Sequence, residues 1–210
     1  MNDLAEVHEH IEDLKTVGGP ACLDFANTVS RRDTDTPNER LFSYAHLIEW
    51  AVHIALITNE DGARLRAAGD ARPAEAEAVF ARAIALREAL FRIFARRADG
   101  EQPDAGDLAI LNQEIAGCYA FLRLAATETG FDWRWAEAPE RLDRILWPVV
   151  DSAADLLTAG ELDRVRVCAG EHCGWLFVDR SKNRSRRWCD MQECGNVAKV
   201  RRYRRRHKEG

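Results

Sequence analysis

Residues 168–208 read CAGEHCGWLFVDRSKNRSRRWCDMQECGNVAKVRRYRRRHK, and this stretch holds four of the six cysteines of the chain. They are Cys168, Cys173, Cys189 and Cys194, which form two C-x4-C pairs separated by fifteen residues. Two close pairs on either side of a short insert are the ligand pattern of a tetrahedral four-cysteine zinc site. We therefore expect one structural Zn²⁺ bound by these four thiolates, with the insert folded as a short hairpin that brings the pairs together.

The same stretch is strongly basic. Residues 180–208 contain twelve Lys or Arg and only two acids, Asp190 and Glu193. A run of like charges can be a solvated tail, whereas basic side chains on a small metal-stabilised fold are typical of nucleic-acid binding. We expect one basic group in the hairpin to contact phosphates and a second group to lie on a terminal helix. The candidates are Arg184, Arg186 and Arg187 in the hairpin, and Lys199, Arg201, Arg202, Arg205 and Arg206 in the helix.

The terminal helix is expected to run from Met191 toward His207. Asp190 and Glu193 are spaced as a capping box at its start, which places Cys194 in the first turn. A zinc site joined to the start of a helix resembles a treble clef. At 100° per residue one side of the helix is apolar, and we expect it to pack on the hairpin while the arginine side faces a DNA major groove. The apolar side consists of Val197, Val200, Tyr203 and His207, with Arg204 as the exception.

The net charge of −5 conceals a division of the chain. Residues 164–210 carry fourteen basic and five acidic side chains, whereas the preceding 163 residues carry sixteen basic and thirty acidic ones. An acidic body and a basic end suggest two roles, so we divide the chain into residues 1–160 and 161–210. We find no secretory signal pattern and no run of ~20 apolar residues that could span a membrane. The cysteine spacing suits a reducing compartment, and a cytoplasmic protein without a membrane partner is expected.

The first 160 residues are predicted to be mainly helical. Helix caps, prolines and 3.6-residue periodicity predict helices over residues 44–57, 59–68, 73–99, 108–117 and 139–157, the last kinked at Pro148. Alternating side chains on both sides of residues 128–130 predict a β-hairpin. The predicted fold class is therefore mainly α. A multihelical N-terminal domain with a small β-hairpin precedes a treble-clef-like four-cysteine zinc finger, which consists of a short hairpin and a basic helix.

Two groups in the first 160 residues are candidate contacts for a small ligand. The first follows a glycine pair, and its side chains either line a pocket or satisfy nearby backbone groups. The second is a pair of tryptophans on one side of a hairpin strand, which form either an aromatic wall or a packed core layer. The candidates are Asp24, Asn27, Thr28, Trp133 and Trp135. No Gly-rich phosphate loop, G-x-S-x-G or H-E-x-x-H motif is present, so we assign no catalytic residue and do not expect an enzyme.

The C-terminal stretch resembles the CGNR zinc-finger family. The resemblance rests on Cys194-Gly195-Asn196, on the preceding CGWLFVD and WC, and on the following AKVRRYRRRH. The upstream part is similar to the N-terminal ABATE domain of the same bacterial proteins. The matching residues are Gly18, Gly19, Leu23, Asp24, Phe25, Asn27 and Thr28, followed by Leu47 and Trp50.

This resemblance implies a stress-induced transcription regulator. In such a protein a mostly helical domain, here residues 1–160, senses a small molecule, and a four-cysteine module, here residues 161–210, binds DNA. The chain departs from the family motif in one place, because the motif ends in Arg and this chain has Val197. If that Arg contacts phosphate or braces the zinc loop, this protein has lost the contact or moved it to Lys199.

Three functions compete at this point. The first is a zinc-dependent, DNA-binding transcription regulator that responds to stress or to an unknown small-molecule effector, and that could act as a homodimer. The second is an RNA- or ribosome-associated protein that uses the same basic module. The third is an enzyme with a pocket lined by Asp24, Asn27, Trp133 and Trp135. Competition by single strands would favour RNA over duplex DNA, whereas an enzyme needs a deep pocket with perturbed titratable groups.

Overall fold

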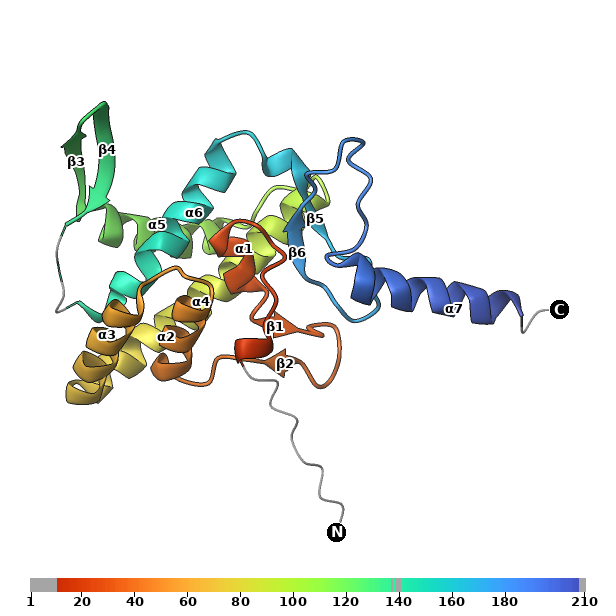
Figure 1. Ribbon diagram of the computed structural model, residues 1–210, viewed down its shortest axis with the longest axis horizontal. Helices are drawn as coiled ribbons and strands as arrows, with labels where there is room; N and C mark the ends of the chain where they lie inside the picture. The colour runs from red at the N-terminus through yellow and green to blue at the C-terminus, as the bar shows by residue number, and fades with distance from the viewer. Residues whose placement is uncertain (1–10, 137, 139–140, 208–210) are drawn as a thin grey trace, which may run out of the picture.

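We describe a computed structural model of the chain, which covers residues 11–136, 138 and 141–207 apart from the side chains of residues 12, 205 and 206. The fold is mainly helical, as predicted (Figure 1). The α-helices are α1 (Ala21–Ala26), α2 (Tyr44–His53), α3 (Asn59–Ala71), α4 (Pro73–Ala98), α5 (Ala105–Tyr119), α6 (Trp147–Thr158) and α7 (Asn196–Arg206). Short 3₁₀ segments are η1 (Ile11–Asp13), η2 (Leu142–Leu146) and η3 (Leu162–Arg164), and the wide helical turn η4 (Met191–Gly195) leads into α7.

The described strands form three antiparallel pairs. They are β1 (Val29–Ser30) with β2 (Asn38–Glu39), β3 (Leu122–Thr127) with β4 (Gly130–Trp135), and β5 (Val165–Val167) with β6 (Leu176–Val178). The second pair is the hairpin predicted around residues 128–130. The third pair encloses the first two cysteines, and of the described strands only β6 lies in the insert that was expected to form a hairpin by itself. The first pair is only two residues long and closes the loop that contains residues 31–37, a segment whose polar composition indicates no strand.

Helix α4 is the centre of the core. Its buried side chains recur at helical spacing and include Leu86, Leu90 and Phe94, none of which is exposed to solvent. Helices α1, α2, α3 and α5 pack around it, and so does strand β5, whereas α6 packs against α1 and α5 (Figure 1). Pro73 occupies the first turn of α4, where its missing N–H leaves no hydrogen bond unmade.

The helix starts follow local chemistry with one difference from expectation. The Ser43 hydroxyl accepts a hydrogen bond from the His46 N–H at the start of α2, as predicted. In α3 the capping residue is Thr58, whose hydroxyl accepts from the Asp61 N–H at 3.0 Å. The predicted helix over 139–157 is divided into η2 and α6 because Pro148 starts a new helix; Pro139 lies outside the described residues.

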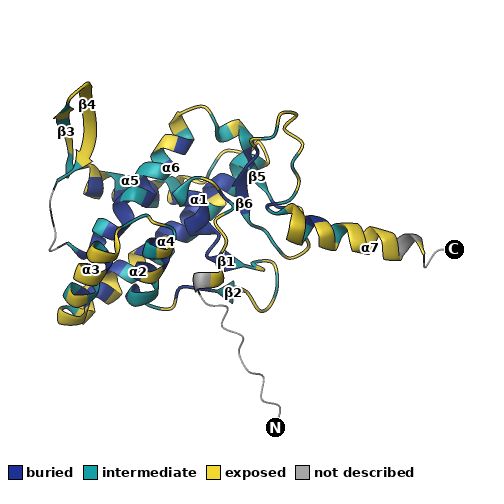
Figure 2. Ribbon diagram, in the orientation of Figure 1, coloured by how far each residue is buried: buried dark blue, intermediate teal, exposed yellow. Residues whose placement is uncertain are grey.

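The β3–β4 hairpin projects from the body, and most of its residues are exposed (Figure 2). Trp133 and Trp135 alternate onto one side of β4, but they have different surroundings. Trp135 lies at the base of the hairpin and packs against Tyr119 and Trp147, with ring centroids 6.2 and 5.4 Å away. Trp133 lies farther out and is 67% exposed, so the two tryptophans form neither a shared core layer nor an enclosed wall.

The β5–β6 hairpin connects the helical body to the cysteine-rich region. Leu176 and Val178 point into the main core, whereas Phe177 between them packs with Cys168 and Cys189. This alternation follows from the two-residue period of a strand. Helix α1 lies against β6 in Figure 1 and contacts it. The hairpin therefore belongs to both packing units at once.

No helix in the described ranges is long and apolar enough to cross a lipid bilayer.

Candidate metal centre and basic helix

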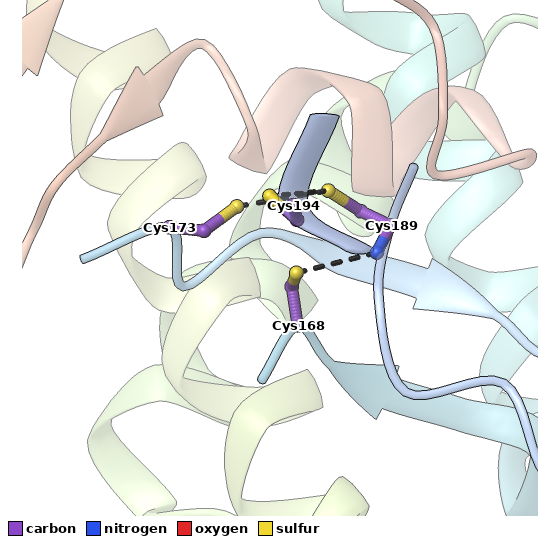
Figure 3. Close-up of side chains that lie close together, drawn as sticks. All are labelled: Cys168, Cys173, Cys189 and Cys194. Atoms are coloured by element: carbon purple, nitrogen blue, oxygen red, sulfur yellow. Dashed lines mark hydrogen bonds between the residues drawn. The ribbon is translucent and has the colours of Figure 1, made fainter. Parts of the chain in front are cut away.

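The four predicted cysteine ligands converge on one point (Figure 3). All four sulfurs lie within 4.8 Å of one another. The Sγ atoms of Cys173 and Cys189 are 3.6 Å apart, and those of Cys189 and Cys194 are 3.8 Å apart. Four sulfurs placed ~2.3 Å from a tetrahedral Zn²⁺ would lie about 3.8 Å from each other. The separations are too long for disulfide bonds, whose S–S length is ~2.05 Å, and they fit one structural zinc ion.

The cluster is supported by backbone donors. The N–H groups of Cys189 and Gly170 donate to the Cys168 sulfur at 3.2 and 3.4 Å. Hydrogen bonds from the neighbouring Cys173 and Cys189 thiols, together with these donors, lower the pKa of Cys168. The pKa values of Cys173, Cys189 and Cys194 are raised, because hydrogen bonding to the Cys168 sulfur, burial and the charge of the Cys168 thiolate oppose further thiolates in the cluster. When bound, Zn²⁺ supplies the bonds that hold the two cysteine loops and the start of α7 together.

Gly170 is required by close packing beside the sulfurs. A Cβ at this position would lie 2.9 Å from the Cys194 Sγ and 3.1 Å from its Cβ. Gly174, on the other side of Cys173, has a φ of +67°, a left-handed conformation that favours glycine. The loop therefore needs its two glycines for different reasons, one for close packing and the other for backbone conformation.

Arg186 braces the zinc loop from inside. Its guanidinium lies 4.6 Å from the centroid of the Phe177 ring and donates to the carbonyl oxygens of Trp188 and Cys189. The buried Asp179 carboxylate accepts from the backbone N–H groups of Ser181 and Arg186, both at 2.9 Å, and so fixes the turn between them. Arg186 is therefore engaged within the protein, and the expectation that it contacts phosphate does not agree with these contacts.

At the start of the terminal helix Asp190 is the N-cap, as predicted, but Glu193 has a different partner from the one expected. The Asp190 carboxylate accepts from the Gln192 N–H at 2.6 Å. Glu193, which was expected to complete a capping box, instead pairs with Lys15 at 2.7 Å. Lys15 also contacts Asp190 at 3.3 Å, so the N-terminal segment is attached to the start of the helix. Cys194 lies in η4, in the first turn after Met191 and just before α7 begins at Asn196.

Helix α7 extends away from the rest of the molecule (Figures 1 and 2). Val197, Val200 and Tyr203 are 52%, 47% and 62% exposed. The prediction that this apolar side packs on the hairpin is therefore wrong. The hairpin and the two zinc loops are short, and only the first turns of α7 reach them.

The basic candidates have different surroundings. Arg184 pairs with Asp163 at 2.5 Å, and Arg201 pairs with Glu171. Lys199 and Arg202 are exposed and form no ion pair with any residue in the described ranges. Arg205 and Arg206 belong to α7, but their side chains lie outside what the structure describes.

A groove lies between the first cysteine loop and α7, with a volume of about 300 Å³. Residues 169–171 and Trp188 form one wall, and Val197, Arg201 and Arg202 belong to the other. Arg187 also lines this groove, with its guanidinium 5.4 Å from the Trp188 ring centroid. The sequence reasoning did not identify Glu171 or Trp188; their only signal was that Trp188 directly precedes a cysteine ligand and Glu171 lies between two.

The candidate ligand residues near the N-terminus are buried and bonded to the backbone. The Gly18 N–H donates to the Asp24 carboxylate at 2.8 Å. Asn27 exchanges two hydrogen bonds with the backbone of Leu176, both at 2.8 Å, and the Thr28 hydroxyl donates to the Phe25 carbonyl oxygen at 2.8 Å. Burial raises the pKa of Asp24 to about 6. These three residues and the tryptophans of β4 lie in separate places, and the structure does not bring them into one pocket.

A different pocket is present among the helices. It has a volume of about 580 Å³ and lies between α2, α3 and the start of α4. Aromatic side chains line it, namely Phe42, Tyr44 and Phe80, together with the charged Arg66, Asp70 and Glu77. The sequence signal for it was weak, because its residues come from three elements and share no short motif.

Comparison with known families assigns both parts of the chain. A family model named ABATE and described as "Putative stress-induced transcription regulator" matches residues 19–160. A second model, described as the CGNR zinc finger, matches residues 164–207. No curated protein matches this chain. The two models describe a regulator and a zinc finger, and neither describes an enzyme.

Proposed function

The chain belongs to the ABATE family and carries a CGNR zinc finger. From this premise we propose that it is a DNA-binding transcription regulator, in which helix α7 contacts the DNA and depends on zinc for its position. The observation that carries the proposal is α7. This helix is anchored at one end by the four-cysteine centre, extends from the body, and exposes the basic side chains of Lys199, Arg202 and Arg204. An α-helix fits the DNA major groove, and the arginines of α7 can contact guanine or phosphate.

In this proposal the nucleic-acid contacts are Lys199, Arg201, Arg202, Arg205 and Arg206 on α7, with Arg184 and Arg187 on the loops. Arg184 must exchange its contact with Asp163 for a phosphate. Such exchange is inexpensive because exposed ion pairs stabilise a protein by ~0–1 kcal/mol. Arg186 is left out of the contact set, since it holds the loop that carries Cys189.

The helical body is the regulatory part in this proposal. The pocket of about 580 Å³ between α2, α3 and α4 is within the usual range of ~300–1,000 Å³ for small-ligand sites, and it combines aromatic walls with a few charged groups. We assign the effector to this pocket in place of Asp24, Asn27, Thr28, Trp133 and Trp135. Compounds that raise the Tm of the full chain would then identify the effector.

RNA is the second candidate ligand, and one observation favours it. Tyr203 is exposed beside the arginines of α7, and an exposed aromatic ring can stack on an unpaired base. Duplex DNA offers no such base.

A selection for bound oligonucleotides tests the proposal. Zinc-loaded full-length protein is presented with random duplex-DNA and single-stranded RNA pools at one fixed salt concentration. Enrichment of a duplex sequence motif is expected, with affinity lost when a chelator removes the zinc. Enrichment of RNA alone would replace the first candidate with the second, and enrichment of neither pool would refute nucleic-acid binding.

A further inference from the structure

The groove between the first cysteine loop and α7 concentrates positive charge. Arg187 lines it on the side of the cysteine loops, and Arg201 and Arg202 line it on the side of the helix. Glu171 is the one acid among its lining residues. Three arginines and a single acid therefore line a space of about 300 Å³, and the acid is paired with one of the arginines, Arg201.

From this arrangement we infer that the groove binds one backbone phosphate of the nucleic acid, and that the Glu171 carboxylate competes with that phosphate for Arg201. The inference rests on the proposed function and adds to it a specific phosphate-binding site and a carboxylate of the protein that competes for that site. Guanidinium groups bind phosphate through two parallel hydrogen bonds, so three of them around one groove make a phosphate site of high charge density.

Glu171 is placed to act as the competitor. It is ion-paired with Arg201 in the free protein. On its other side Glu171 lies 3.7 Å from the Nε2 of His172, whose Nδ1 is 3.1 Å from Asp33. The carboxylate therefore contacts both Arg201 and His172, while about half of its side chain is exposed to solvent.

The other two arginines are open to a ligand. Arg187 and Arg202 make no ion pair with any part of the chain that the structure describes. Arg187 also stacks near Trp188, which limits the directions in which its guanidinium can point. The phosphate would thus meet two uncommitted guanidinium groups first, and then displace Glu171 from the third.

The test measures binding of a fluorescein-labelled mixed-sequence DNA duplex to the zinc-loaded full chain by fluorescence anisotropy, between about 50 and 200 mM salt. Arg187→Ala should weaken binding and reduce the magnitude of the negative slope of log K against log salt by roughly 0.9, the value for one lost phosphate contact. Arg202→Ala, on the other wall, is the second variant and should do the same. Each variant is used only with wild-type zinc stoichiometry.

Glu171→Gln should tighten binding on the order of two- to fivefold, the range expected for removing one exposed ion pair that competes with the ligand. The matched control is Glu161→Gln, because Glu161 also pairs with an exposed arginine, Arg180, at 3.1 Å but lies outside the groove. In an Arg201→Ala background, Glu171→Gln should lose most of its effect, since the competition acts through that arginine.

The outcomes separate the two proposals. If the wild type binds the duplex but both arginine variants keep its affinity and salt slope, the phosphate-binding site is refuted while DNA binding stands. Equal gains for Glu171→Gln and Glu161→Gln would refute the competitor role, because net charge alone would then explain them. If the wild type binds neither this duplex nor a single-stranded RNA of the same sequence, the proposed function itself fails.

Discussion

Replacing Asn27 with Ala should destabilise the protein strongly, because this side chain makes hydrogen bonds to the backbone of strand β6. Its amide nitrogen donates to the Leu176 carbonyl oxygen, and its amide oxygen accepts from the Leu176 N–H, both at 2.8 Å. Leu176 has no exposed surface, so neither backbone group can bond to water after the substitution. Each buried backbone group left without a partner costs about 1–3 kcal/mol. The free energy of unfolding should therefore fall by about 2–6 kcal/mol.

Urea denaturation of the zinc-loaded chain, followed by circular dichroism, measures this loss. For a chain of this size the Tm should fall by roughly 2–4 °C per kcal/mol. The control is Asn112→Ala, the same substitution at an exposed position of α5, which should change stability by no more than about 0.5 kcal/mol. A loss below about 1 kcal/mol for Asn27→Ala would refute the structural role and return Asn27 to the list of ligand contacts.

Four further predictions concern the metal centre, the groove and pH. Cys189→Ser should lower the zinc content measured by mass spectrometry of the native protein and unfold the C-terminal module, because a structural zinc supplies folding free energy; retention of one zinc per chain would contradict the ligand set. Gly170→Ala should weaken zinc binding in a chelator competition, since its Cβ would lie 2.9 Å from the Cys194 sulfur; unchanged affinity would show that the loop can move. Val197→Arg adds a cation at the groove and should tighten duplex binding. The negative slope of log K against log salt should become steeper by roughly 0.9, whereas an unchanged slope would mean that this position does not reach phosphate. The folded-state pKa of Asp24, about 6, exceeds its unfolded value, so its stabilising contribution is complete below about pH 4 and is lost as the pH rises through 6. The stability of the wild type relative to Asp24→Asn should therefore decrease between pH 4 and pH 7, and a constant difference in urea denaturation would exclude the raised pKa.

The metal centre was predictable because coordination chemistry constrains sequence spacing directly. Two C-x4-C pairs leave few arrangements that can surround one ion, and the sulfurs of Cys168, Cys173, Cys189 and Cys194 converge as expected. The helices of the body were predictable for a similar local reason. Capping hydroxyls, helix-starting prolines and 3.6-residue periodicity act within a few residues of where they occur.

The environments of charged and apolar side chains were harder to predict, because they depend on distant parts of the chain. A helical projection identifies the apolar side of α7, but it does not reveal that the short zinc loops leave Val200 and Tyr203 uncovered. The charge of Arg186 likewise suggests phosphate, and only the fold shows its guanidinium over Phe177. Asn27 and Leu176 are 149 residues apart in sequence, so no local pattern indicates their pairing.

The alternation along β6 couples metal occupancy to the helical body. Leu176 and Val178 are held by the main core, and Phe177 between them by the cysteine centre, so neither side can loosen without disturbing the other. Thermodynamic reciprocity then requires that any compound whose affinity for the body rises upon zinc binding must raise the affinity for zinc by the same factor. A free-zinc titration with and without such a compound would therefore measure the coupling between the helical body and the metal centre without any nucleic acid present.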